Sequence, residues 1–159
     1  MKIRKSRMED LPKMEEIYQK AREFMIATGN PHQWSNGYPA HNLLVEDIQK
    51  GISFVCEDDG EVVAVFCFYK EHEIDYDGIF DGKWLDDKPY GVIHRIASIR
   101  KGAGSFCIDY CYKKTGNIRI DTGDDNIPMQ KCLLKNGFKY CGRIVLASIN
   151  EERMAFHRN

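Results

Sequence analysis

The segment from Tyr90 to Lys114 constrains the fold most, because a strand pattern, a glycine-rich turn and a helix pattern follow one another directly. Tyr90 to Ser98 reads as a strand, Arg100-Lys101-Gly102-Ala103-Gly104 comes next, and Ser105 to Lys114 has helical periodicity and is closed by Gly116. Glycines in such a turn let the backbone approach a ligand, and the N–H groups of a helix start favour an anion. The order predicts either a site for a phosphate-bearing ligand or a tight turn without one.

Hydrophobic periodicity and turn residues predict the other elements. Asp58-Asp59-Gly60 indicates a tight hairpin, Asp10 is expected to cap the first helix, and residues 71–89 are expected to form a long excursion. No repeat or linker divides the chain, so residues 1–159 are expected to be a single mixed α/β domain. Further helices are expected at 11–27, 41–50 and 126–136, and further strands at 2–7, 52–56, 61–70, 117–122, 138–144 and 153–157.

Composition excludes several classes of protein. The 159 residues carry a net charge of −1, which argues against nucleic-acid binding, since that normally needs a basic surface. The longest apolar run, Val62 to Tyr69, is far short of the ~20 residues of a membrane-spanning helix. The basic residues at the start are not followed by the apolar core of a secretory signal. We therefore expect no nucleic-acid or membrane partner and a cytoplasmic location.

The six cysteines are expected to be reduced, mostly buried thiols. No Cys-x-x-Cys pair occurs, and several cysteines lie inside apolar periodic segments. None of the five histidines has the spacing from a cysteine that a zinc finger or ribbon requires. The sequence therefore predicts no metal site.

Two motifs resemble the GNAT superfamily of acyl-CoA-dependent N-acetyltransferases, and the order of elements extends that resemblance over nearly the whole chain. Ile99-Arg100-Lys101-Gly102-Ala103-Gly104 is similar to the family's Gln/Arg-x-x-Gly-x-Gly/Ala turn, with Ile99 in the first position. The segment from Asn126 to Phe138 is similar to the family's Asn-x-x-Ala-x-x-Leu-Tyr-x-x-x-Gly-Phe, with Leu133 in place of the tyrosine. The resemblance implies an α/β (α+β mixed) fold with a six- to seven-stranded, mostly antiparallel sheet flanked by about four helices.

The resemblance implies direct transfer of an acetyl group from acetyl-CoA, as co-substrate, to a primary amine. In the family, the turn holds the pyrophosphate, the preceding strand polarises the thioester and the asparagine touches the pantetheine arm. Asn126 can equally be a plain helix cap. Rival readings are a non-catalytic acyl-CoA-binding module and a nucleotide-binding protein that uses the glycine turn. The implied cofactor-binding residues are Ile96, Ala97, Ser98, Arg100, Lys101, Gly102, Ala103, Gly104, Ser105 and Asn126.

His94 is the leading candidate for the general base, because imidazole titrates near working pH. The competing reading is a hydrogen-bonded structural histidine. Strand alternation predicts Val92, His94 and Ile96 on one face and Ile93, Arg95 and Ala97 on the other, so that only one of His94 and Arg95 faces the reacting groups. Because Leu133 replaces the family's usual acid, the departing thiolate would be protonated by solvent or by Tyr140.

The acceptor is expected to be a small-molecule or peptide amine, bound by a monomer or homodimer. Trp34 and Tyr38 lie in the loop that lines the acceptor side in the family, although core packing explains Trp34 equally well. Glu71, Glu73 and Asp75 could serve as bases through water. They belong to an acidic stretch, residues 71–87, that would either attract a cationic amine or merely be solvated.

Overall fold

All seven strands join one sheet in the computed structural model, which describes residues 1–159. The strand order is β1-β2-β3-β4-β5-β7-β6, and every neighbouring pair is antiparallel except β4 and β5. The predicted fold class is confirmed. The elements are β1 (Lys2–Lys5), η1 (Met8–Asp10), α1 (Leu11–Ala27), α2 (His41–Gln49), β2 (Ser53–Asp58), β3 (Glu61–Tyr69), η2 (Ile74–Gly78), β4 (Gly91–Ser98), α3 (Ala103–Thr115), β5 (Ile118–Thr122), α4 (Ile127–Lys135), β6 (Lys139–Leu146) and β7 (Glu151–Arg158).

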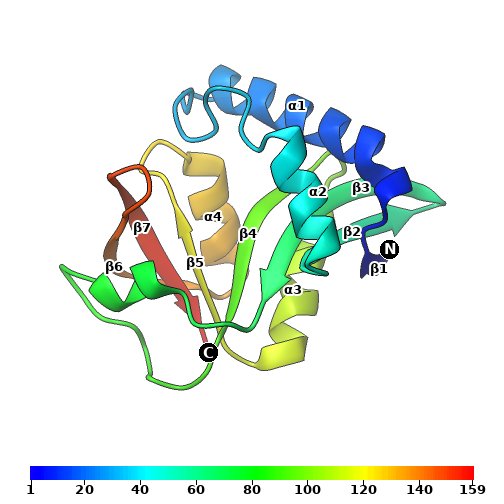
Figure 1. The fold of residues 1–159 in the computed structure, drawn as a ribbon. Helices are drawn as coiled ribbons and strands as arrows, with labels where there is room; N and C mark the ends of the chain where they lie inside the picture. The colour runs from blue at the N-terminus through cyan, green and yellow to red at the C-terminus, as the bar shows by residue number, and fades with distance from the viewer.

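The parallel pair is short, and this shapes the whole molecule. Only Gly91 with Ile118 and Val92 with Arg119 are paired between β4 and β5. Figure 1 shows the two strands together at their lower ends and well apart at their upper ends. The sheet is therefore split into two wings beyond Val92.

The predicted hairpin between β2 and β3 is confirmed. Asp59 and Gly60 have φ angles of +51° and +75°, as expected for a two-residue turn that matches the twist of the strands. Asp10 is the N-cap residue of α1, as predicted, but its carboxylate makes no capping hydrogen bond to that helix. Its carboxylate instead accepts hydrogen bonds from the Arg4 guanidinium at 2.7 and 2.8 Å and from the Arg7 amide at 2.7 Å. The Asp10 carboxylate thus ties β1 to the start of α1.

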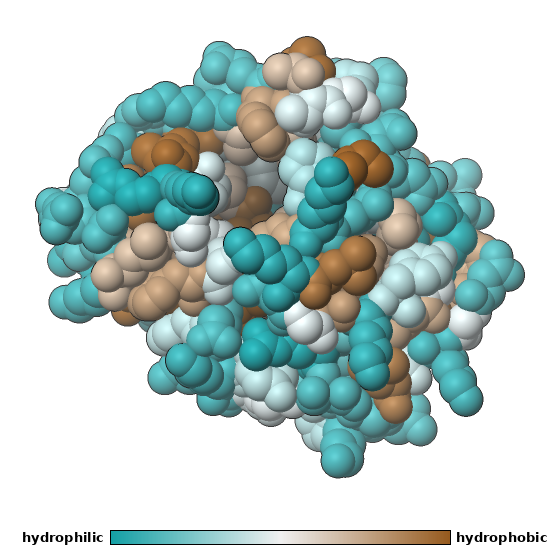
Figure 2. Space-filling model, turned by 180° about the vertical axis from the view of Figure 1, so that it is seen from behind, coloured by the Kyte–Doolittle hydropathy of each residue, from teal (hydrophilic) through white to brown (hydrophobic).

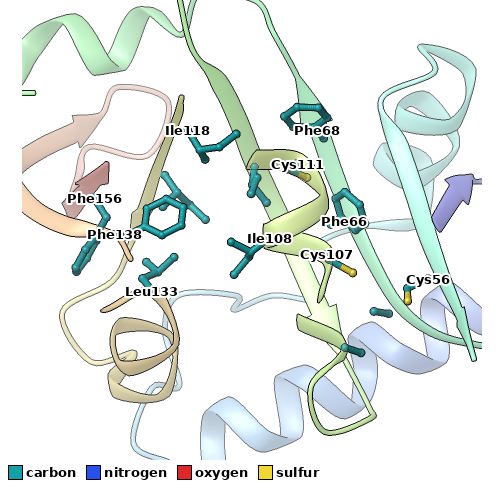
Figure 3. Packing of buried hydrophobic residues seen from close by; sticks show 14 of the residues in the cluster. Cys56, Phe66, Phe68, Cys107, Ile108, Cys111, Ile118, Leu133, Phe138 and Phe156 are labelled. Carbon is teal, nitrogen blue, oxygen red and sulfur yellow. The ribbon is translucent and has the colours of Figure 1, made fainter. Parts of the chain in front are cut away.

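Opposite faces of the sheet pack against different helices. α1 and α2 cover one face, where Met14, Ile17 and Leu44 bury against Val65 and Ala97. α3 and α4 cover the other, where the larger apolar cluster lies. In Figure 3, Ile108 of α3 lies between Phe66 of β3 and Leu133 of α4. Each such buried side chain stabilises the fold by about 1.5–3 kcal/mol, so both faces of the sheet are held by an apolar cluster.

The cysteines follow the sequence prediction in most respects. All six are free thiols; five are buried and Cys132 is half-buried.

None of the helices has the length and apolar composition needed to span a membrane.

The excursion between β3 and β4 folds back onto the sheet and covers the end of the α1/α2 face. Tyr76 is fully buried there, and the Trp84 indole donates to its carbonyl at 2.8 Å. Gly82 is required by close approach, because a Cβ there would lie 1.9 Å from the Cys141 carbonyl oxygen. Leu85 N–H donates to His157 Nδ1 at 3.0 Å, and His157 Nε2 pairs with the Asn117 side-chain oxygen. The excursion is therefore anchored by a neutral histidine.

The anchoring histidine predicts an acid-sensitive fold. Burial lowers the pKa of His157 to about 4, whereas in the unfolded chain it is near 6.5. The unfolded state then binds more protons between these values, so stability should fall as pH drops from 7 to 4, by on the order of 3 kcal/mol from this group. His157→Gln should be less stable at pH 7 but flatter over this range in urea unfolding. The exposed control His41→Gln should keep the wild-type slope; an unchanged slope in His157→Gln would contradict the assignment.

Candidate active site

The main cavity, of about 540 Å³, lies in the gap where β4 and β5 separate. The α3/α4 side is lined by apolar groups such as Ile93, Ile96 and Ile120, together with Asn126. The opposite side is polar. Figure 2, seen from behind, shows a hollow in the surface with apolar residues inside it. A ligand can therefore reach through the split sheet, with an apolar part on one side and a polar part on the other. The polar side is lined by His32, Trp34, Tyr38, Glu73, Asp75, His94, Arg95, Asp121, Glu151 and Arg153.

A bulge in β4 decides which side chains face the cavity. Cys67 pairs with His94 and Val65 with Ala97, so Phe66 alone faces two residues, Arg95 and Ile96. Arg95 has a φ of +52°, in the left-handed region that non-glycine residues rarely occupy. The predicted alternation is therefore wrong beyond His94. Ile96 packs with Ile93 in the α3/α4 cluster, and both His94 and Arg95 line the cavity.

Buried contacts from α1 and α2 hold the strained residue. The Tyr18 hydroxyl donates to the Arg95 carbonyl at 2.7 Å. The Arg95 guanidinium donates to both carboxylate oxygens of Asp47, at 3.0 and 2.9 Å, and to the Tyr38 hydroxyl at 3.2 Å. Because Asp47 is almost completely buried, this ion pair is little screened by solvent. The guanidinium thus positions the bulge and a cavity-lining tyrosine together.

The loop between α1 and α2 brings Trp34 and Tyr38 to the cavity, as expected. The Trp34 ring is half-buried and packs edge-on against Tyr18 at 5.6 Å and near Tyr38 at 6.3 Å. Gln33, which sequence reasoning missed, closes the loop over the far strand: its Oε1 accepts from the Gly123 amide and from Asn126 Nδ2, both at 3.2 Å. The loop therefore spans the split between the wings.

His94 belongs to a small polar group at the mouth of the excursion. Its Nε2 lies 3.8 Å from Glu73 Oε2, and its ring stacks on Tyr69 with centroids 5.8 Å apart. The Tyr69 hydroxyl donates to Glu73 at 2.8 Å. His94 first, and then this hydroxyl and the Asp75 amide, lower the pKa of Glu73 to about 2. Glu73 is therefore an ionised partner for the imidazole. Of the other two acids considered from sequence, Asp75 also lines the cavity, whereas Glu71 is exposed and does not line it.

Two neighbouring residues at the end of β5 complete the cavity and were missed from sequence. Asp121 lies on the polar side, where burial raises its pKa and the Tyr76 hydroxyl donates to it at 3.2 Å. Thr122 lies on the other side, 1% exposed, and its hydroxyl has no hydrogen-bond partner. Their position in the sequence could have indicated them, because Asp121 and Thr122 lie at the carboxyl end of β5, and ligands commonly bind at the carboxyl ends of parallel strands in open α/β sheets.

The predicted phosphate turn lies at the start of α3. Gly102 is its N-cap with a φ of +85°, and the amides of Gly104 and Ser105 have no acceptor in the protein. Such free N–H groups at a helix start suit an anion. Lys101 is exposed, but Arg100 is already paired with Asp58 and Glu61, at 2.7 and 3.2 Å. Of the predicted cofactor residues, Ile96 and Asn126 line the cavity, whereas Ala97, Ser98, Arg100, Lys101, Gly102, Ala103, Gly104 and Ser105 do not.

Asn126, Leu133 at the position of the family's usual acid, and Tyr140, the substitute considered for it, have clear positions. Asn126 caps α4, with its Oδ1 accepting from the Met129 amide at 3.3 Å, while it also lines the cavity. Leu133 is fully buried in the apolar cluster. Tyr140 is 48% exposed on β6, packs against Phe156 and does not line the cavity. The structure brings His94 and Asn126 to the site but not Tyr140.

Comparison with known proteins identifies solved structures that have this architecture. No protein-family model matches the sequence, and no curated protein does either. A GNAT-family acetyltransferase structure from Streptococcus agalactiae is 30% identical with a TM-score of 0.90, over 99% of this chain and 94% of that chain. One from Listeria monocytogenes is 18% identical with a TM-score of 0.70, over 99% and 93%. N-acetylglutamate synthase from Neisseria gonorrhoeae, in complex with coenzyme A and N-acetyl-glutamate, is 13% identical with a TM-score of 0.64, over 99% of this chain and 34% of that chain.

The split mixed sheet, together with these similarities, places the chain in the class of the acetyltransferases. Within that class, this chain belongs to the GNAT family.

The unpartnered hydroxyl gives a prediction about stability. A buried hydroxyl without a partner is unfavourable, so Thr122→Val should raise the free energy of unfolding of the ligand-free protein by about 1 kcal/mol. Thr115→Val is the matched control with the opposite sign, because Thr115 donates to the carbonyls of Cys111 and Asn117, at 3.3 and 3.1 Å. Urea unfolding measures both. A destabilised Thr122→Val would show that the hydroxyl has a partner in solution.

Proposed function

We propose that the protein transfers the acetyl group of acetyl-CoA to the primary amino group of an acceptor. One observation carries the proposal: the cavity passes through the split sheet, with apolar side chains on one side and, on the other, His94 next to the ionised Glu73, while free amides lie at the start of α3, the helix after β4. The Neisseria enzyme of the same fold, in complex with coenzyme A, supports the choice of co-substrate. The free thiols also support our proposal that the enzyme works in the cytoplasm.

This chain's residues fit coenzyme A by chemistry. The amides of Gly104 and Ser105 would hold the pyrophosphate at the start of α3, and Lys101 adds a free positive charge there. The apolar wall near Ile93 and Ile96 suits the pantetheine arm. Thr122 lines the same cavity, with a buried hydroxyl that has no partner in the protein.

The backbone of β4 supplies the electrophilic assistance in this proposal. Acetyl-CoA supplies a thioester whose carbonyl carbon is open to direct attack by an amine. Beyond Val92, β4 is no longer paired with β5, so its edge beside Ile96 faces the cavity. Backbone N–H groups preorganised for a developing negative charge are worth about 3–4 kcal/mol each in enzymes. The bulge at Arg95 sets the direction of these groups.

His94 accepts the proton of the amine in the proposed mechanism. Its Nε2 faces the Glu73 carboxylate, so the tautomer with hydrogen on Nε2 leaves Nδ1 free as the acceptor. Glu73, ionised at any working pH, then stabilises the imidazolium that forms. Leu133 and Tyr140 are both outside the cavity, so water protonates the departing thiolate. No cysteine is needed as a nucleophile.

A non-catalytic acyl-CoA-binding module is the second candidate function, favoured by one observation. Leu133, at the position of the family's usual tyrosine acid, is sealed in the apolar cluster. Release of free coenzyme A in the presence of a panel of primary amines separates the two functions. Acetyl-CoA binding without release would favour the binding module.

Blocking the turn at α3 tests co-substrate binding. A Cβ at Gly104 would meet only the Ser98 hydroxyl, at 3.6 Å, so Gly104→Leu should fold while covering the free amides. Acetyl-CoA at 100 times its Kd should stabilise the wild type by about 2.7 kcal/mol, and this gain should vanish in Gly104→Leu. Gly78→Leu, at a glycine with open space around it, is the control. An unchanged affinity for coenzyme A in Gly104→Leu would overturn this placement of the phosphates.

Removing the imidazole tests the proton transfer. His94→Gln should lower kcat/KM about 100-fold and remove the lower limb of the pH–rate profile, because general-base catalysis is lost. Glu73→Gln should lower the rate less and shift that limb, since Glu73 acts through His94. His72→Gln, an exposed histidine of the same excursion paired with Asp77, is the control. A near-normal rate with an unchanged profile in His94→Gln would make His94 a structural residue and water the base.

A further inference from the structure

Arg153 places a positive charge in the polar side of the cavity that the proposed chemistry does not use. Its side chain is only 9% exposed, and its Nη1 donates to Glu151 at 2.5 Å. Nε and Nη2 have no acceptor in the protein, and both are accessible from the cavity rather than sealed in the interior. Two donors of a buried guanidinium are therefore open to a ligand.

A carboxylate of opposite charge lies beside Arg153 without closing on it. Asp121 of β5 is directly opposite Ala155 of β7, and Arg153 is two residues from Ala155 on the same face. Diagonal neighbours of this kind are roughly 7–8 Å apart. No hydrogen bond or ion pair joins the two, since Asp121 accepts from Tyr76 and Arg153 donates to Glu151. The polar side of the cavity thus contains a guanidinium, Arg153, and a carboxylate, Asp121, that are not paired with each other.

The other strong charges of this side are already paired. Arg95 is held by Asp47, and His94 lies beside Glu73. Asp75 remains unpaired farther out on the excursion, where it adds to the attraction for an ammonium group. Asp121 and the open half of Arg153 are therefore the groups left to select a ligand.

We propose that Asp121 and Arg153 form a subsite for a zwitterionic acceptor of the α-amino-acid class, with its amino group toward Asp121 and its carboxylate on Arg153. The inference rests on the proposed function and names the acceptor's chemistry. An ammonium and a carboxylate one carbon apart fit between diagonal neighbours. A guanidinium binds a carboxylate through parallel N–H donors. His94, from the neighbouring strand, then takes the proton of the amine that Asp121 orients.

The remaining wall of the subsite favours an apolar side chain on that acceptor. Trp34, Leu146 and Ile149 also line the cavity. The cavity, about 540 Å³ in all, must also admit the end of the co-substrate. The subsite therefore has room for a free amino acid rather than a folded protein.

The test compares matched acceptors that differ only in the carboxylate. Leucine, leucinamide and isopentylamine are assayed by release of coenzyme A with the wild type, Arg153→Gln and Arg143→Gln. The wild type should prefer leucine, and Arg153→Gln should lower kcat/KM for leucine roughly 10- to 100-fold. For the two acceptors without a carboxylate, the same variant should change it less than threefold. Arg143, whose exposed ion pairs with Asp124 and Glu152 lie outside the cavity, should be neutral for all three.

Each outcome has a distinct meaning. Turnover of leucinamide or isopentylamine in preference to leucine would overturn the subsite and leave acetyl transfer to an amine intact. An equal loss for all three acceptors in Arg153→Gln, at an unchanged melting temperature, would make Arg153 a structural residue and also overturn it. If Arg153→Gln does not fold, Arg153→Lys replaces it, and the loss must again be confined to leucine. Absence of coenzyme A release with every amine would instead contradict the proposed function.

Discussion

The buried ion pair between Arg95 and Asp47 is the contact on which the site depends. It holds Arg95 in the left-handed conformation that produces the bulge in β4, together with the Tyr18 hydroxyl on the Arg95 carbonyl. Buried pairs of this kind add little net stability, but losing one partner leaves an uncompensated charge. The pair is therefore best understood as a device that directs β4 toward the cavity between the wings.

The split of the sheet has a chemical consequence. The two antiparallel wings are joined by only two paired positions between β4 and β5 and by the large apolar cluster under α3 and α4, which contains residues of both. A ligand in the gap meets apolar side chains on the α3/α4 side and charged ones on the α1/α2 side. In the proposed reaction, the amine and the thioester would approach from opposite faces and meet at the backbone of β4, the geometry that direct transfer requires.

The charges of the excursion show how composition and placement differ. Residues 71–87 are strongly acidic in sequence, yet their carboxylates do different things. Glu73 and Asp75 line the cavity, whereas Asp86 binds the side chains of Asn117 and Asn159 and thereby fastens the segment to the sheet. The acid that lies deepest in the site, Asp121, comes from β5. A count of charges along the chain therefore overstates the excursion's part in the electrostatics of the site.

Local signals determined the elements, and only the tertiary structure decided the site. Hydrophobic periodicity, Asp59-Gly60 and the glycines around α3 predict strands, hairpin and turn, because backbone preferences act between near neighbours. Strand alternation put His94 on the face opposite Ile93 but misassigned the faces of Arg95 and Ile96, and Asn126 was indicated only by the resemblance to the GNAT family. Alternation assumes an unbroken strand, and the bulge is imposed by Tyr18 and Asp47, far away in sequence. The meeting of Asp121, Thr122 and Arg153 with His94 likewise depends on sheet order and on the parting of β4 from β5, which are properties of long-range packing.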